Sequence, residues 1–224
     1  MHRPETRAEC VRRYERLLPR LSDYVHHWAR EQPESLALVE HHTGAHVTWK
    51  RFAQAMDAFS ARLLAMGLRK GDVVATSLPF LKEHVFLAYG CFQIGVLVAP
   101  LDLRLKPAEI LDAFGKVRPK ACFHLGNSPK ADFRPIFAQV QKAAPYCRHW
   151  IQFQTDADGI LPGAQWIDTW ARRIKLHYAW SKVIGSVRRA AAVVGKRDPA
   201  LLIFTTGSTT GSPKPAMLCH ENVL

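Results

Sequence analysis

The residues from Thr205 to Lys214 combine types that can hold phosphate groups. The stretch TTGSTTGSPK follows the apolar run LLIF and ends on Pro213 and Lys214. Glycine lets a backbone adopt left-handed turns and approach a ligand closely, so Gly207 and Gly211 would let successive N–H groups converge on phosphate oxygens. The hydroxyl groups add donors, and Lys214 adds a charge-assisted hydrogen bond worth on the order of 1.5–3 kcal/mol where water is largely excluded. The stretch is therefore a candidate nucleotide-phosphate site.

Two other structures could account for this stretch, a Walker A loop and a polar surface turn. A Walker A loop requires Gly immediately before Lys and a helix directly after, whereas here Pro213 precedes Lys214 and AMLC reads as a strand. An ordinary P-loop NTPase is therefore a poor match. A Ser/Thr/Gly-rich surface turn between two strands is the alternative that this stretch, taken alone, leaves open.

The segments before this stretch alternate between helical and strand patterns. Phe52, Met56 and Phe59 recur at helical spacing, and Gly67 follows at the position of a left-handed cap. We expect helices over 49–66, 82–94, 106–114 and 134–144, and strands within 70–78, 96–101, 120–125, 148–153, 201–204 and 216–219. This rhythm predicts the α/β class, with a parallel-rich sheet and helices on both faces.

The charge is strongly positive and concentrates late in the chain. Lys and Arg number 31 against 19 Asp and Glu, a formal net charge of +12. Between Gln165 and Asp198 eight basic and two acidic residues are interleaved with Trp166, Trp170, Tyr178 and Trp180. The interpretation we favour is a helix whose aromatics pack on the domain while its cations face water. The alternative is a surface for a partner, a polyanion or a membrane.

Cysteine usage and hydropathy indicate a cytoplasmic protein, or one peripheral to a membrane surface. The five cysteines are widely spaced, with no CxxC pair and no zinc spacing, which is typical of reduced, buried thiols. The opening residues lack the apolar core of a secretory signal. Residues 85–101 are apolar but are interrupted by Gly and Pro, so we expect a buried helix running into a strand and no transmembrane segment. No feature indicates a specific nucleic-acid partner.

The segment FTTGSTTGSPKPAMLCHENVL resembles the signature loop of the adenylate-forming superfamily, the AMP-dependent synthetases and ligases that include acyl-CoA synthetases. That pattern runs approximately Tyr/Phe-Thr-Ser-Gly-Ser/Thr-Thr-Gly-x-Pro-Lys-Gly, then an apolar strand and His-x-Asn. Two upstream stretches, HVTWKRFAQAMDAFSARLLAMGLRKGDVVATSLP and CFQIGVLVAPLDLRLKPAEI, resemble family segments and come in the family's order. Three motifs in order are more specific than one glycine loop.

The resemblance implies a fold, a reaction and a set of site residues. It divides the chain into an N-terminal extension, 1–20, and a partial AMP-binding domain, 21–224, the first part of the family's large α/β N-terminal domain. The implied reaction activates a carboxylic acid with ATP and Mg²⁺ as an acyl-adenylate and transfers the acyl group to a thiol, usually that of coenzyme A. The residues implied to bind the nucleotide phosphates are Thr206, Gly207, Ser208, Thr209, Thr210, Gly211 and Lys214. His220 is either an acyl-pocket residue or a strand-end histidine.

The sequence departs from the family pattern in two ways. Three residues separate Gly207 from Gly211 where the family has two, and Pro215 replaces a small residue after the lysine. A misplacement of about 1 Å in such a loop can cost roughly a hundredfold in rate. The match also ends at Leu224, before the family's adenine, ribose and Mg²⁺ segments, so no catalytic residue is assigned.

Two expectations follow for the isolated chain. We expect it to be a catalytically incomplete N-terminal portion of an acid–CoA ligase, with apolar faces that promote association. The alternative is a non-catalytic basic interaction module.

Overall fold

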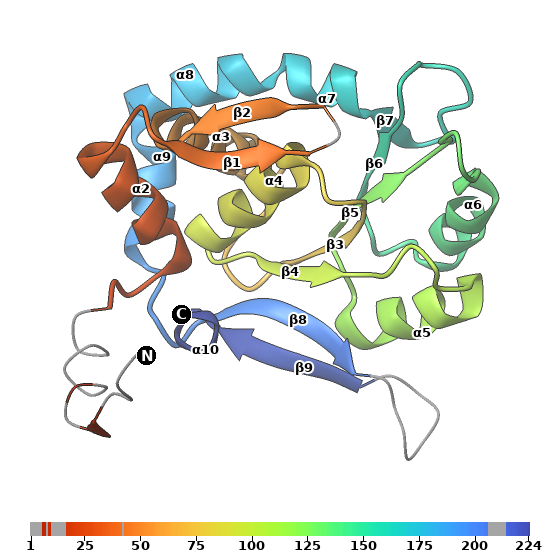
Figure 1. Cartoon of the computed structure of the whole chain (residues 1–224). Helices are drawn as coiled ribbons and strands as arrows, with labels where there is room; N and C mark the ends of the chain where they lie inside the picture. Colours follow the sequence, from red (N-terminus) through yellow and green to blue (C-terminus); the bar gives the residue numbers. More distant parts are fainter. Residues whose placement is uncertain (1–5, 8, 10–16, 42, 206–213) are drawn as a thin grey trace.

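The computed structural model describes residues 6, 7, 9, 17–41, 43–205 and 214–224. Its main sheet contains β3 (Val73–Ser77), β4 (Leu97–Pro100), β5 (Ala121–Leu125), β6 (His149–Phe153), β7 (Ala164–Trp166), β8 (Pro199–Thr205) and β9 (Lys214–Cys219). The strand order is β7-β6-β5-β3-β4-β8-β9 (Figure 1). All neighbours pair in parallel except β8 and β9, which form an antiparallel hairpin. The predicted parallel-rich α/β sheet is confirmed.

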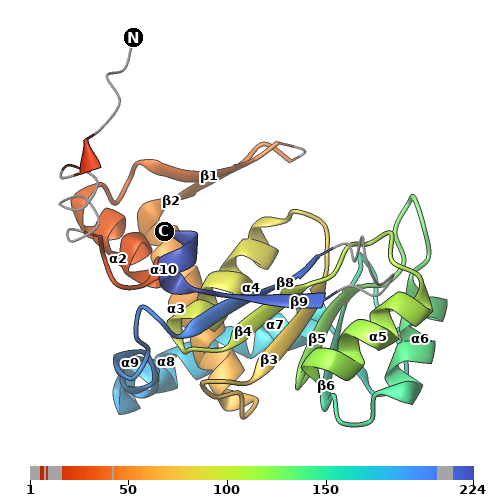
Figure 2. The same ribbon diagram turned by 90° about the horizontal axis from the view of Figure 1, so that it is seen from below.

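Helices cover both faces of this sheet. The longer helices are α2 (Leu21–Glu31), α3 (Trp49–Ala65), α4 (Lys82–Gln93), α5 (Pro107–Val117), α6 (Arg134–Ala143) and α8 (Ile174–Ile184). The shorter ones are α7 (Ile167–Arg172), α9 (Ser186–Ala192) and α10 (His220–Val223). Helices α5 and α6 lie on one side of the strands, and α3, α4, α7 and α8 lie on the other (Figure 2).

Alternating side chains along the strands build two core clusters. Val74 and Phe123 pack with α3, α4 and α7, while their neighbours Ala75 and Cys122 pack with α5 and α6. Successive strand residues point to opposite faces, so a strand buried on both sides must be apolar throughout. This explains why the predicted strands read as continuous apolar runs.

The predicted helix boundaries depend on caps that the structure contains. The Thr48 hydroxyl accepts a hydrogen bond from the Arg51 N–H at the start of α3, and Gly67 takes a φ of +85° just after its end. At the start of α5, the Glu109 carboxylate accepts from the Lys106 N–H at 2.7 Å. All the helices and strands expected up to residue 153, and the strands on either side of residues 206–213, are confirmed.

The structure also contains a two-stranded antiparallel sheet that the sequence pattern did not predict. It is formed by β1 (Leu36–Glu40) and β2 (Ala45–Thr48), directly before α3. Leu36 and Val39 are both more than half exposed, so this hairpin lacks the alternation of a half-buried strand. Lys82 at the start of α4 contacts the Glu40 carboxylate at 3.3 Å and ties the hairpin to the domain.

The basic segment after residue 165 is three helices, α7, α8 and α9, where we expected one. Gly185, with a φ of +65°, ends α8 and forces a change of direction into α9. Trp170 is fully buried as expected, but Trp180 is 61% exposed, so the expectation that the aromatics of this segment pack on the domain is wrong for Trp180.

The described cysteines are free thiols. Cys91, Cys122 and Cys147 are buried and Cys219 is half-buried, which agrees with the expectation of reduced thiols, and Cys10 lies outside the described residues. Burial raises the pKa of the Cys147 thiol to about 12. The apolar residues 85–101 include most of α4 and all of β4, so they form a buried helix running into a strand, as expected. None of the helices in the described part of the chain has both the length and the apolar character needed to cross a bilayer.

Candidate active site

The described ends of the candidate phosphate stretch, Thr205 and Lys214, lie at the carboxyl edge of the parallel sheet. Strand β8 brings the chain to Thr205 at this edge, and β9 begins at Lys214, directly opposite Thr205 in the hairpin register. Residues 206–213 connect these two positions. Ligands of open α/β sheets bind outside the carboxyl ends of the strands. The ends of the stretch are therefore where a phosphate-binding segment of this fold belongs.

Lys214 is the one residue of the predicted phosphate set that the structure describes. It is the first residue of β9 and is exposed. The other six, Thr206, Gly207, Ser208, Thr209, Thr210 and Gly211, lie outside the described residues. Their role in phosphate binding stays a prediction.

His220 lies at the other end of β9 from Lys214. With six residues in β9, the two positions are roughly 15–20 Å apart along the strand. His220 is fully buried, accepts a hydrogen bond at Nδ1 from the Leu21 N–H at 3.3 Å, and stands edge-on to the ring of Phe92. Burial, followed by the charge of Arg20, lowers its pKa. This environment favours a strand-end histidine, and the acyl-pocket role stays a prediction.

An apolar cavity of about 1020 Å³ opens at the carboxyl ends of β3, β5 and β6. Its lining includes Leu103, Leu125, Phe133 and Phe153, with Lys130 among the polar residues. From β3 the chain crosses to β4 on one side, and from β5 it crosses to β6 on the other, so the neighbouring strands β3 and β5 flank a topological switch point. Crevices at such points are the usual ligand sites of this fold class.

Glutamine side chains fix the loop that borders the cavity. Gln152 is fully buried and donates to the Gln154 Oε1 at 2.6 Å, while its own Oε1 accepts from the Leu161 N–H at 3.0 Å. Gln154 donates in turn to the Asp158 carbonyl at 2.6 Å. A Cβ atom at Gly126 would lie 2.3 Å from the Gln154 Oε1 and 2.8 Å from the Cγ of buried Gln152, so a larger residue here would displace this network. The network keeps the cavity wall in one arrangement.

His84, near the start of α4, is held neutral beside this edge. Its Nδ1 lies 3.2 Å from the Pro79 carbonyl and its Nε2 lies 3.0 Å from the Thr76 hydroxyl. A carbonyl can only accept, so Nδ1 carries the proton and Nε2 accepts from Thr76. Burial lowers the pKa of His84, which favours the neutral ring. We infer a positioning role for this residue, which orders the turn after β3.

Among the described residues there is no group of three or more His, Cys, Asp or Glu that could hold a metal ion. Mg²⁺ can also be held by nucleotide phosphates together with one or two protein groups.

The parallel-rich sheet, its antiparallel β8–β9 hairpin and the helices on both faces form the architecture of the N-terminal domains of adenylate-forming enzymes. The chain belongs to the AMP-binding enzyme family, whose model matches residues 25–224. It is 25% identical over 205 residues to the medium-chain fatty-acid–CoA ligase of Escherichia coli K12, covering 91% of this chain and 33% of that protein. It is 26% identical to the mitochondrial medium-chain acyl-CoA ligase ACSF2 of Bos taurus, covering 88% of this chain and 32% of the relative.

Solved structures agree on the fold. Acetoacetyl-CoA synthetase from Streptomyces lividans superposes with a TM-score of 0.70 at 20% identity, covering 91% of this chain and 31% of that chain. The N-terminal domain of FACL13 from Mycobacterium tuberculosis superposes with a TM-score of 0.65 at 23% identity, covering 91% and 45%. The chain spans about a third of the length of the curated relatives it matches.

Sequence reasoning missed the residues of the apolar cavity. Leu103 lies within a motif that supported the resemblance, but no chemical role was assigned to it. Phe133 directly precedes an expected helix and Phe153 ends an expected strand, and neither pattern indicates a chemical role for these residues. The available signal was that both Leu103 and Leu125 lie at or just after the carboxyl end of a predicted parallel strand.

Proposed function

We propose that this chain forms the phosphate-binding N-terminal portion of an ATP-dependent acid–CoA ligase. The observation that carries the proposal is the β8–β9 hairpin, which places Lys214 at the carboxyl edge of the sheet within the matched AMP-binding region. An ammonium group at this position supplies a point charge for the β- or γ-phosphate of ATP. The predicted residues 206–211 would supply backbone N–H and hydroxyl donors.

The reaction has two steps. The carboxylate of the acid attacks the α-phosphorus of ATP and pyrophosphate leaves, which gives an acyl-adenylate. The thiol sulfur of coenzyme A then attacks the acyl carbon, AMP leaves, and the thiol proton passes to solvent. Mg²⁺, bound with ATP, would screen phosphate charge. This chain's contribution is to orient the phosphates, so that the α-phosphorus is held in position for attack by the carboxylate.

The acid is proposed to be a fatty or other apolar acyl acid. The names of the relatives, which include medium-chain fatty-acid and acyl-CoA ligases, support this substrate class. The cavity of about 1020 Å³ at the carboxyl edge offers an apolar volume for a nonpolar part of the acid or of coenzyme A. Since the chain spans a third of its relatives, we expect the isolated chain to bind nucleotide without turning it over.

Carboxylate-dependent exchange of pyrophosphate into ATP tests the proposal, using this sequence together with its native downstream segment. We expect exchange with at least one of a panel of short- to long-chain acids, and a roughly 10- to 100-fold loss in Lys214→Ala. Lys175→Ala, an exposed lysine of α8, is the matched control and should retain activity. The proposal fails if a correctly folded protein exchanges with no acid, or if both variants lose activity equally.

An exposed ridge on α8 favours a second candidate function, binding of a partner, a polyanion or an anionic membrane surface. Leu176, Trp180 and Val183 are each more than 60% exposed and lie at spacings that share one helix face. Lys175 and Arg173 lie beside them in the sequence. Apolar groups bordered by cations suit the headgroup region of an anionic bilayer.

Vesicle co-sedimentation distinguishes this candidate from the ligase function. Binding to anionic vesicles that is lost in Trp180→Ala and retained in Lys214→Ala would support it. Equal binding to zwitterionic vesicles, or none to either, would exclude the membrane form. Salt-sensitive binding to heparin without vesicle binding would favour the polyanion form.

A further inference from the structure

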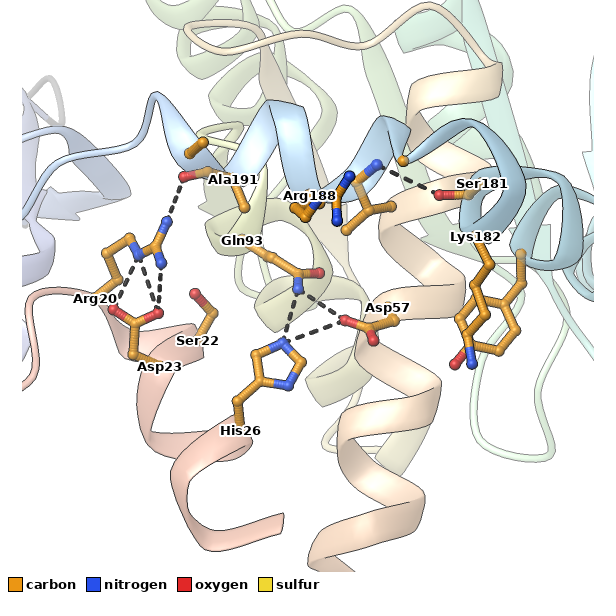
Figure 3. A pocket seen from close by; sticks show the side chains of 14 residues that line it. Arg20, Ser22, Asp23, His26, Asp57, Gln93, Ser181, Lys182, Arg188 and Ala191 are labelled. Atoms are coloured by element: carbon orange, nitrogen blue, oxygen red, sulfur yellow. Dashed lines mark hydrogen bonds and ion pairs between the residues drawn. The ribbon is translucent and has the colours of Figure 1, made fainter. Parts of the chain in front are cut away.

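A second pocket, of about 530 Å³, lies between α2, α3, the end of α4, α8 and α9 (Figure 3). Gln93, the last residue of α4, lines this pocket. Because α4 leads from the carboxyl end of β3 to the amino end of β4, the pocket lies close to the amino edge of the sheet. Strand β8 starts at that edge and runs seven residues, roughly 20 Å, before it reaches the candidate phosphate stretch. The pocket is therefore separate from the proposed ligase site, and the inference drawn from it does not depend on that function.

The acidic groups of the pocket already have partners. Asp23 accepts three hydrogen bonds from the Arg20 Nε and Nη2 atoms at 2.7–3.0 Å, and Arg20 also donates to the Ala191 carbonyl of α9. Asp57 accepts from the Gln93 amide at 2.8 Å and lies 3.3 Å from the His26 Nε2. These contacts fix both carboxylates on the wall of the pocket (Figure 3).

Two cations of the pocket, Arg188 and Lys182, form no salt bridge with a carboxylate among the described residues. Within the described part of the chain, the side chain of Arg188 in α9 makes no hydrogen bond or ion pair, and Lys182 of α8 contacts the side chain of Tyr178, with its Nζ 4.6 Å from the ring centroid. A concave surface with low-dielectric walls concentrates the field of such charges and attracts anions. Arg188 carries the planar fork of donors that matches a phosphate or carboxylate group.

Ser22 adds a buried donor that is directed into the same space. Its residue is only 1% exposed, and its hydroxyl has no hydrogen-bond partner among the residues that the structure describes. Figure 3 shows this side chain pointing from α2 toward α9. A hydroxyl that lines a pocket and makes no hydrogen bond within the described protein can donate to a ligand oxygen.

We propose that this pocket binds a small phosphorylated or carboxylated molecule, with Arg188 and Lys182 holding the anionic group and Ser22 donating to a second oxygen. A volume of 530 Å³ lies within the range of roughly 300–1,000 Å³ that is usual for small-molecule sites. The Gln93 amide, which donates to Asp57 and is fixed through its Oε1 by the Ser60 hydroxyl at 2.5 Å, forms a rigid floor. A rigid site loses little conformational entropy when it binds.

Isothermal titration at fixed ionic strength tests the inference, with pyrophosphate and citrate as the two probes. We expect saturable one-site binding of at least one probe and a loss of about tenfold or more in affinity for Arg188→Gln. Arg189→Gln is the matched control, because it removes the same charge from the next residue, whose guanidinium instead contacts the Ile184 carbonyl. Its effect should stay below about twofold. Stronger binding of pyrophosphate assigns a phosphorylated ligand, and stronger binding of citrate assigns a carboxylated one.

A second readout locates the bound probe. The side-chain amide resonances of Gln93 should shift on titration in the wild-type protein and in Lys214→Ala, but not in Arg188→Gln. Equal weakening by Arg188→Gln and Arg189→Gln, or no saturable binding of either probe, would overturn the inference. Binding that is lost only in Lys214→Ala would also overturn it, while leaving the ligase proposal intact.

Discussion

His124 should make the fold sensitive to acid. It lies near the end of β5, is fully buried, and stacks on the ring of Phe137 with centroids 4.2 Å apart. Its Nδ1 lies 3.1 Å from the Leu125 carbonyl, so this nitrogen carries the proton of the neutral ring. Its Nε2 is buried and has no hydrogen-bond partner in the described part of the chain. Protonation would therefore place an unpaired N–H and a charge among aromatic rings.

The size of the effect follows from the pKa. Burial lowers the pKa of His124 from 6.5 to about 4. Between these values the unfolded chain binds more protons than the folded protein, so the free energy of unfolding falls as the pH falls. At 1.36 kcal/mol per pKa unit, the contribution is about 3 kcal/mol, complete above pH 6.5 and lost as the pH falls toward 4.

Urea unfolding at pH 7 and pH 4.5 measures this contribution. Wild type should lose about 2–3 kcal/mol more than His124→Phe over this interval, because the phenylalanine ring cannot take a proton. His46→Phe, at an exposed position of β2, is the control and should keep the wild-type dependence on pH. Identical pH dependence in wild type and His124→Phe would refute the argument, whatever the absolute stability of the variant.

Three further predictions concern packing, the cavity and the thiols. Gly90→Ala would place a Cβ 3.0 Å from a side chain and 3.2 Å from a backbone nitrogen of α3, so thermal unfolding should show that the free energy of unfolding falls by about 1–3 kcal/mol. Gly115→Ala, with open space around it, should raise the free energy of unfolding by about 0.5–1 kcal/mol. Leu103→Trp, which fills part of the carboxyl-edge cavity, should raise KM for the acid or for coenzyme A in the complete ligase and leave KM for ATP unchanged; unchanged kinetics for all three substrates would separate the cavity from the reaction. Iodoacetamide should label half-buried Cys219 before Cys147, whose pKa burial raises to about 12, and the reverse order in a mass-spectrometric time course would contradict the burial argument.

Local sequence signals predicted the elements well because each has a local cause. Apolar strands such as β4 are buried on both faces, and helix ends are fixed by Thr48 and Gly67. The hairpin of β1 and β2 was missed because its side chains are exposed on both faces, as at Leu36 and Val39. The class of fold could therefore be predicted, while an element stabilised by a few distant contacts could not.

Long-range order depends on contacts that no local pattern contains. β5 pairs with β3, although β4 lies between them in the sequence, and this crossing creates the switch point beside the cavity. Likewise Trp170 and Trp180 share a basic, aromatic segment, yet only Trp170 finds a site against Phe123 and Phe59. The candidate phosphate site could be proposed from the sequence because it is one contiguous stretch, and its role stays a prediction. Both pockets are assembled from segments far apart in the chain.

The β8–β9 hairpin gives Lys214 a structural role, protection of the sheet edge, in addition to its proposed role in phosphate binding. β9 is the last strand of the sheet among the described residues, and an open strand edge promotes association with other chains. Lysine and proline are the residues that protect such edges, and Lys214 is followed by the exposed Pro215, which pairs with Phe204. The replacement of the family's small residue by proline is thus compatible with an edge strand. Lys214→Ala would remove both the proposed phosphate contact and an edge charge, so a loss of activity supports the phosphate role only if size-exclusion chromatography shows an unchanged oligomeric state.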